Sequence, residues 1–196
     1  MRFFDYVTID KYLMDPCHDY SSRHARSLNA KRWKEILFDI YLGEDVFEEA
    51  QSWYGASSKE ISHATPVPDY HVKHAINKFF FSTHPVEGKT MVSLYRHLRA
   101  SKSNRVCILS VHGGMKEGSW VYWDNNQFVE PIQDWVNRVV TTPTLFMQND
   151  HYGALVVIAC NENRCELTSP LPGVAVYYPV GIVGGVFNEH SIVCAR

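Results

Sequence analysis

A histidine and a cysteine stand at the ends of two similar apolar runs of this sequence. RVCILSV, at 105–111, is followed by His112, and ALVVIAC, at 154–160, ends on Cys160. A thiol and an imidazole that meet in a folded protein can carry out nucleophilic catalysis. The imidazole takes the thiol proton and later protonates the leaving group. These two side chains are therefore the first candidates for a catalytic pair.

A glycine directly after the histidine adds a second feature of that chemistry. Gly113 has no Cβ, so its backbone N–H can approach an oxyanion closely. The N–H of Cys160 is the natural second donor, and two such donors stabilise the charge that develops on a carbonyl oxygen under attack. The sequence thus predicts an acyl-transfer site made of His112, Gly113 and Cys160.

Continuous apolar runs alternate with amphipathic segments after residue 72, which predicts an α/β fold with a mostly parallel sheet flanked by helices. Strands are predicted at 78–82, 105–111, 154–160 and 173–185, helices at 89–100 and 130–140, and a small hairpin at 120–129. Catalytic groups of such sheets collect beyond the carboxyl ends of the strands. Because parallel strands end at the same edge, we expect His112 and Cys160 to meet there.

The first 72 residues are predicted to form a helical N-terminal extension (1–72) that precedes an α/β domain (73–196). From Asn29 to Gly43 the apolar residues recur at helical spacing, and a second amphipathic segment ends before Gly55. The polar, proline-containing stretch at 57–71 is interpreted as a linker or a wrapping loop.

Composition excludes several classes of protein. The chain has 196 residues, with 19 Lys and Arg against 21 Asp and Glu, so it lacks the basic excess of a nucleic-acid binder. No apolar run approaches the roughly eighteen residues of a membrane span. Asp5 and Asp10 interrupt what would be the apolar stretch of a signal peptide. Five cysteines, an odd number without framework spacing, indicate reduced thiols, so we expect a cytoplasmic protein that binds neither nucleic acid nor membrane.

The two motifs, VCILSVHGG and ALVVIACNE, resemble those of the caspase-like cysteine peptidases, in which one strand ends in His-Gly and another in Ala-Cys. The separation here is 160 − 112 = 48 residues, close to the roughly fifty expected in caspases. The resemblance covers residues 75 to about 185, and the Ala-Cys-Asn form is closest to the CHAT branch of this group.

The resemblance implies a caspase-like fold and a cysteine endopeptidase that acts on a protein substrate without a metal or other cofactor. Cys160 would be the nucleophile and His112 the acid and base, with Gly113 and Cys160 supplying the oxyanion N–H groups. Caspases have a glutamine where this chain has Ile158, so cleavage after aspartate is not expected. The resemblance places His84 at the specificity pocket. Glu162, just past the nucleophile, would favour basic substrate side chains.

Two alternatives stand beside the peptidase. Only 36 residues follow Cys160, fewer than the caspase-like family usually has, so either the pocket is minimal, or the chain is cut or shortened, or a protein partner activates the domain or completes the pocket. The alternative function is a catalytically inactive caspase-like module that binds or regulates a partner. Cys160, Cys165, His190 and Cys194 form a weaker alternative as a zinc site. Cys160 lies in a strand pattern and the loop with Cys165 holds no further ligand, so no metal is expected.

Overall fold

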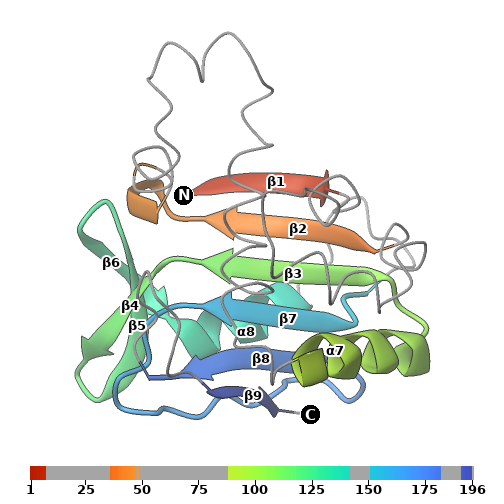
Figure 1. Cartoon of the computed structure of the whole chain (residues 1–196). Coiled ribbons are helices and arrows are strands. Elements are labelled where there is room, and N and C mark those ends of the chain that lie inside the picture. The colour runs from red at the N-terminus through yellow and green to blue at the C-terminus, as the bar shows by residue number, and fades with distance from the viewer. Residues whose placement is uncertain (8–35, 47, 49–87, 142–150, 182–190, 196) are drawn as a thin grey trace, which may run out of the picture.

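The computed structural model describes residues 1–7, 36–46, 48, 88–141, 151–181 and 191–195. Its strands are β1 (Arg2–Val7), β2 (Leu37–Leu42), β3 (Arg105–Ser110), β4 (His112–Lys116), β5 (Ser119–Asp124), β6 (Gln127–Pro131), β7 (Ala154–Ile158), β8 (Ala175–Val180) and β9 (Ser191–Ala195). The described helices are α7 (Gly88–Ser101) and α8 (Ile132–Thr141). The strands form a six-stranded sheet in the order β1-β2-β3-β7-β8-β9 and a separate three-stranded sheet, β4-β5-β6 (Figure 1).

The inner strands of the large sheet are parallel. β3 pairs in parallel with β2 on one side and with β7 on the other, and β7 pairs in parallel with β8. The edge strands β1 and β9 are antiparallel to their neighbours. Every residue of β3 and β7 is buried, which explains why both read as continuous apolar runs. The predicted α/β class with a mostly parallel sheet is confirmed.

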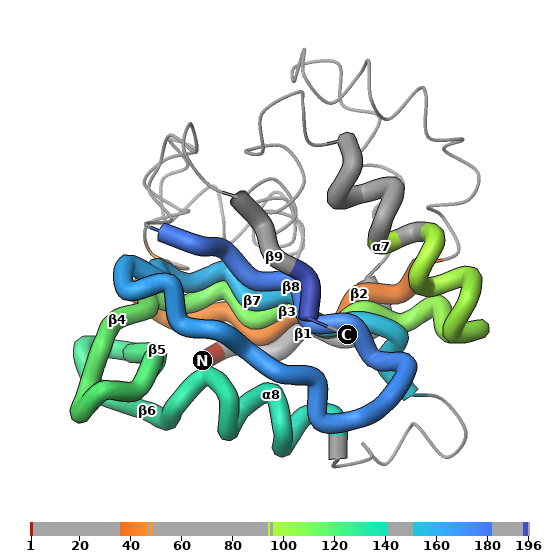
Figure 2. Tube along the Cα trace, turned by 90° about the horizontal axis from the view of Figure 1, so that it is seen from below, coloured from red at the N-terminus to blue at the C-terminus, as the bar shows by residue number. Residues whose placement is uncertain are grey.

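Helices α8 and α7 lie against different parts of the large sheet (Figure 2). The apolar side of α8, with Ile132, Trp135 and Val136, packs into a core with residues of β3, β7 and β8. Helix α7 buries Leu94 and Leu98, and a Cβ on Gly153 would lie 2.7 Å from the Leu98 side chain. Both helices lie where the sequence predicted them.

One prediction is wrong. The segment from Asn29 to Gly43 was expected to be helical, but its described part contains β2, which joins the sheet beside β3. The sequence LFDIYL fits both periods, because its apolar residues also alternate: Phe38, Ile40 and Leu42 are fully buried. Its aromatic and β-branched residues favour a strand. Pairing with β3 decides between the two states.

The described part of the predicted N-terminal extension is therefore not helical as a whole. It contributes β1 and β2 to the same sheet as the strands after residue 72, and a helical turn begins at Glu44. The predicted domain boundary near residue 72, the predicted strand at 78–82 and His84 lie outside the described residues.

A buried polar network crosses the sheet between β2, β3 and the start of β7. The Asp39 carboxylate accepts hydrogen bonds from the Arg105 guanidinium and from the Tyr152 hydroxyl, each at 2.5 Å. All three side chains are less than 5% exposed, and the guanidinium also lies 5.4 Å from the centroid of the Tyr152 ring. The ion pair of Asp39 and Arg105 is thus shielded from water. In such a setting the loss of either charge leaves the other uncompensated.

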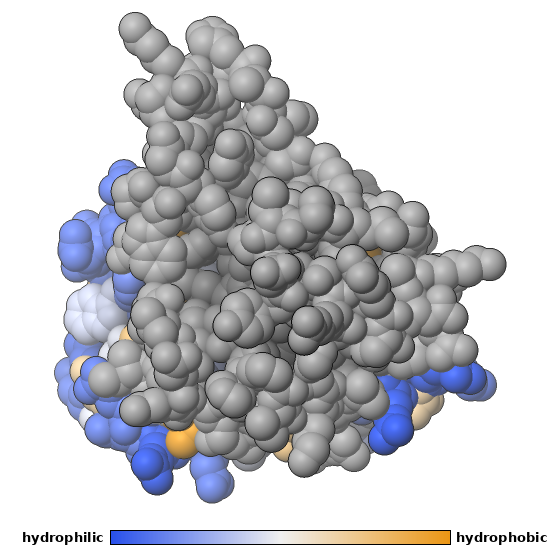
Figure 3. All heavy atoms as spheres, in the orientation of Figure 1, coloured by the Kyte–Doolittle hydropathy of each residue, from blue (hydrophilic) through white to orange (hydrophobic). Residues whose placement is uncertain are grey.

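The described surface is mainly hydrophilic where Figure 3 shows it, at the margins of the face seen in that view. The more exposed large apolar side chains include Met115, Phe128 and Val129 on the small sheet and Leu171 in the loop before β8. Among the described residues, no helix is both long and apolar enough to cross a membrane.

Candidate active site

Strands β3 and β7 end side by side, as their sequences predict. Ser110, the last residue of β3, pairs with Ile158, the last of β7, and the Val111 N–H donates to the Ile158 carbonyl over 3.0 Å. His112 and Cys160 each follow two residues beyond these strand ends. The parallel register therefore delivers both segments to one edge of the sheet.

The backbones of Gly113 and Cys160 are in direct contact at this edge. A Cβ built on Gly113 would lie 2.3 Å from the Cys160 carbonyl oxygen and 2.8 Å from the Cys160 nitrogen. No real side chain tolerates such distances, so only glycine allows this approach. The structure thus brings together the two segments that carry His112, Gly113 and Cys160. Cys160 is partly exposed and forms no disulfide among the described residues.

The histidine segment is itself a strand, which sequence reasoning missed. His112 begins β4, which pairs antiparallel with β5 and places His112 opposite Trp123. The turn between them has Glu117 and Gly118 at φ values of 50° and 79°. Two successive residues with positive φ are typical of the tight type I′ hairpin turn. The residue pair Glu-Gly between two short runs was the available signal.

The predicted hairpin at 120–129 is confirmed as β5 and β6. Its turn contains Asn125 and Asn126, both with positive φ (51° and 56°), a conformation that asparagine tolerates better than most residues. Because β4 adds a third strand, the hairpin becomes a small sheet that holds the start of the histidine segment in place.

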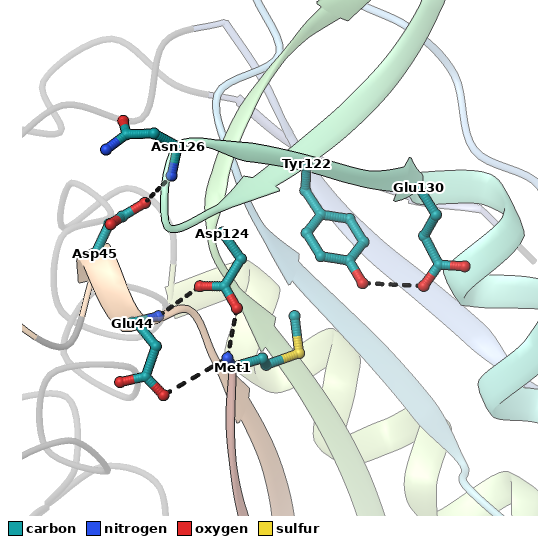
Figure 4. A network of polar contacts seen from close by, with 7 residues as sticks. All are labelled: Met1, Glu44, Asp45, Tyr122, Asp124, Asn126 and Glu130. Carbon is teal, nitrogen blue, oxygen red and sulfur yellow. Dashed lines mark hydrogen bonds and ion pairs between the residues drawn. The ribbon is translucent and has the colours of Figure 1, made fainter.

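The small sheet is tied to the end of β2 by the polar contacts in Figure 4. The Asp124 carboxylate accepts a hydrogen bond from the Glu44 N–H over 2.7 Å, and the Asn126 N–H donates to Asp45 over 3.3 Å. The Met1 ammonium group pairs with the carboxylates of Asp124 and Glu44. These contacts link β2, two strands away from β7 in the large sheet, to the hairpin that follows His112.

A second set of contacts joins β5 and β6 of the small sheet to helix α8. The Tyr122 hydroxyl donates to the Glu130 carboxylate over 2.9 Å, and Arg138 of α8 pairs with the same carboxylate. Burial, followed by the neighbouring carboxylate, raises the pKa of Tyr122, so the phenol stays neutral and keeps its donated proton at ordinary pH. The small sheet is therefore anchored to both β2 and α8.

The loop after Cys160 is held by a buried asparagine. Asn161 is 1% exposed, and its side-chain amide contacts the backbone of Cys165 and of Pro179. The carbonyl of Cys160 accepts a hydrogen bond from the indole Nε1–H of Trp120 over 2.7 Å. Sequence reasoning did not single out Trp120 or Asn161. Asn161 lies within the ALVVIACNE motif, and Trp120 lies at the start of the predicted hairpin at 120–129, but neither place indicated this contact.

The predicted specificity residues lie in different surroundings. Ile158 is 4% exposed inside β7, beside the buried Ser110, and its side chain is apolar. Glu162 lies on the exposed part of the loop after Cys160, together with Asn163 and Arg164. His84 lies outside the described residues.

The described thiols differ in their surroundings. Cys107 is fully buried in β3, and burial, aided by Asp39, raises its pKa well above the ordinary thiol value. Cys160, Cys165 and Cys194 are partly exposed, and the Cys165 sulfur lies 3.7 Å from the sulfur of Met115. Within the described ranges, no group of three or more His, Cys, Asp or Glu residues could hold a metal ion.

Alkylation should follow this difference. At pH 7 to 8 we expect iodoacetamide to modify Cys160 at least tenfold faster than Cys107, because the thiolate is the reacting form and a raised pKa lowers its fraction. Peptide mapping of the native protein after timed labelling measures both rates. Unfolding in urea is the control and should bring the rates together. Equal labelling in the native protein would contradict the greater accessibility of Cys160 relative to Cys107.

Comparisons with known proteins add no relative. No protein-family model, no curated protein and no solved structure matches the chain.

Proposed function

We propose that the protein is a cysteine endopeptidase that uses Cys160 as nucleophile and His112 as general acid and base. The observation that carries the proposal is the contact of Gly113 with the backbone of Cys160 at the shared edge of β3 and β7. It joins a histidine-glycine segment to a partly exposed thiol, which is the set of groups that acyl transfer needs.

In the proposed reaction the Cys160 sulfur attacks the scissile carbonyl carbon as His112 takes the thiol proton. The N–H groups of Gly113 and Cys160 stabilise the resulting oxyanion. The carbon–nitrogen bond then breaks, and His112 gives its proton to the departing amine. Water, deprotonated by His112, hydrolyses the thioester and releases the free thiol. Each step uses groups of this chain, and no redox partner is consumed.

We further propose a caspase-like peptidase of the CHAT type, for which the arrangement of elements and the Ala-Cys-Asn sequence are the support. The histidine and cysteine segments follow neighbouring parallel strands, and a hairpin sheet and a helix lie between them in the chain. The reaction needs a reduced thiol, which fits the cytoplasm. A protein partner that activates the domain or completes its specificity pocket remains part of the proposal.

The proposed specificity follows from the side chains near the cysteine. Ile158 offers no hydrogen bond to a substrate carboxylate, and an unpaired buried carboxylate is costly. We therefore expect cleavage after basic or small residues rather than after aspartate. Glu162, exposed on the neighbouring loop, is the proposed partner of a basic side chain.

A peptide-library digest tests the function. The wild-type protein should cleave, Cys160→Ala should abolish cleavage, and His112→Ala should lower kcat/KM by at least a thousandfold, since both the nucleophile's activation and the leaving-group proton are lost. Cys165→Ala, which removes another partly exposed thiol, is the matched control and should retain activity.

Cleavage that survives Cys160→Ala would overturn the proposal. If the wild-type protein cleaves no peptide alone, and its mixture with a cell extract cleaves none beyond those cut by the same extract with Cys160→Ala, the inactive interaction module becomes the better interpretation. Efficient cleavage after aspartate would contradict the specificity derived from Ile158.

A further inference from the structure

Asn161 is buried, and both the nitrogen and the oxygen of its side-chain amide make hydrogen bonds. The Nδ2 group donates to the carbonyls of Cys165 and Pro179, each over 2.9 Å, and Oδ1 accepts from the Cys165 N–H over 2.8 Å. The first and third of these bonds fix both backbone polar groups of Cys165. The second ties the loop to the end of β8.

The backbone of Asn161 adds a further pair of bonds. Its N–H donates to the Gly181 carbonyl over 2.7 Å, and its carbonyl accepts from the Gly181 N–H over 2.9 Å. The carbonyl of Cys160 belongs to the same peptide group as the Asn161 N–H, and it is held by the Trp120 indole. The peptide group that follows the candidate nucleophile is therefore held at both its oxygen and its nitrogen.

We propose that Asn161 is a positioning residue that fixes the orientation of Cys160, an inference that rests on the proposed function. Rotation of the peptide group after Cys160 would swing the Cα–Cβ bond that carries the thiol. The Gly181 pair and Trp120 prevent this rotation, and the Asn161 side chain holds the loop that carries this peptide to the end of β8. A misplacement of about 1 Å can cost a hundredfold in rate.

The alternative is that Asn161 only stabilises the loop. Because this buried side chain makes three hydrogen bonds, its loss must also lower stability, since each polar group left unpaired keeps its desolvation cost. Stability alone therefore does not separate the two roles. The rate per folded molecule does, since a residue that only stabilises leaves the folded site unchanged.

The test compares Asn161→Asp with Asn163→Asp. Both substitutions replace an amide by a carboxylate near Cys160, but Asn163 is exposed. At Asn161 the carboxylate would face the carbonyls of Cys165 and Pro179, to which it has no proton to donate. Asn163→Asp therefore controls for added negative charge, and Asn161→Ser keeps a small side chain that can still donate one hydrogen bond.

Each variant is assayed at a temperature where thermal unfolding shows it to be fully folded. We expect Asn161→Asp to lower kcat about a hundredfold with KM changed less than threefold, and Asn161→Ser to recover part of the loss. The rate and pH profile of Cys160 alkylation by iodoacetamide should change in Asn161→Asp. Asn163→Asp should match the wild type in every measurement.

Two outcomes would overturn the inference. One is a folded Asn161→Asp protein with wild-type kcat and a wild-type alkylation profile. The other is an equal loss in Asn163→Asp, which would assign the effect to charge. If the wild-type protein cleaves no peptide, the proposed function fails separately, and the alkylation profile still decides whether Asn161 orients the thiol.

Discussion

Replacing Gly113 by alanine is expected to lower peptidase activity at least a hundredfold. The new Cβ would lie 2.3 Å from the carbonyl oxygen and 2.8 Å from the nitrogen of Cys160, and both are backbone atoms that no rotamer change can move away. Relief requires β4 to shift away from the end of β7. That shift moves His112 relative to Cys160, and small displacements of reacting groups are costly in rate.

Gly114→Ala is the matched control for this prediction. The Cβ at that position would meet the Trp123 indole nitrogen at 3.1 Å, and a side chain can give way by a few tenths of an ångström. The same added methyl group, one residue along the same strand, should therefore leave activity within threefold of the wild type. Values of kcat/KM on one peptide substrate measure both effects.

Gly113→Ala should be less stable than Gly114→Ala, just as it should be less active. Overpacking against backbone costs about 1–3 kcal/mol, so Gly113→Ala should unfold at lower urea concentration than Gly114→Ala. Full activity and unchanged stability in Gly113→Ala would show that the histidine segment does not touch Cys160 in solution. In that case the observation that carries the proposed function would be lost.

Replacing Asp39 by leucine is expected to destabilise the fold by about 3–5 kcal/mol. The Arg105 guanidinium and the Tyr152 hydroxyl both donate to Asp39, and Arg105 is only 3% exposed. The substitution leaves a buried positive charge without its carboxylate. Urea unfolding, monitored by circular dichroism, measures the decrease in the free energy of unfolding.

A double variant separates loss of the ion pair from loss of packing. Asp39→Leu combined with Arg105→Met replaces the pair by apolar groups, and such replacements are often neutral or stabilising. The double variant should therefore be more stable than Asp39→Leu alone. Arg138→Gln, which breaks a pair whose arginine side chain is 52% exposed, should cost less than about 1 kcal/mol. Equal losses at Asp39 and Arg138 would contradict a shielded network.

The sequence was informative about the central strands and the helices. The VCIL of β3 and the whole of ALVVI in β7 are apolar, and such runs can bury both faces of a strand only inside a sheet. Helices α7 and α8 show a clear apolar side, and the turn with Asn125 and Asn126 carries its own local signal. These features depend on neighbours in the chain, so they can be read without the structure.

Strand β2 shows where local pattern stops being sufficient. LFDIYL fits a helix and a strand nearly equally, and only its parallel register with β3, with Asp39 opposite Cys107, settles the state. The same register explains a carboxylate in the middle of an apolar strand. Its partners, Arg105 and Tyr152, are 66 and 113 residues away in the chain.

By itself the sequence determined the α/β class, the two apolar strands that His112 and Cys160 follow, and the glycine, Gly113, directly after the histidine. Their types and spacing are local properties. Tertiary structure decided that Gly113 touches the backbone of Cys160, that β4 joins a separate sheet, and that Trp120 and Asn161 hold the peptide after Cys160. Each of these depends on contacts between segments far apart in the chain, whose energies appear only when the strands are packed.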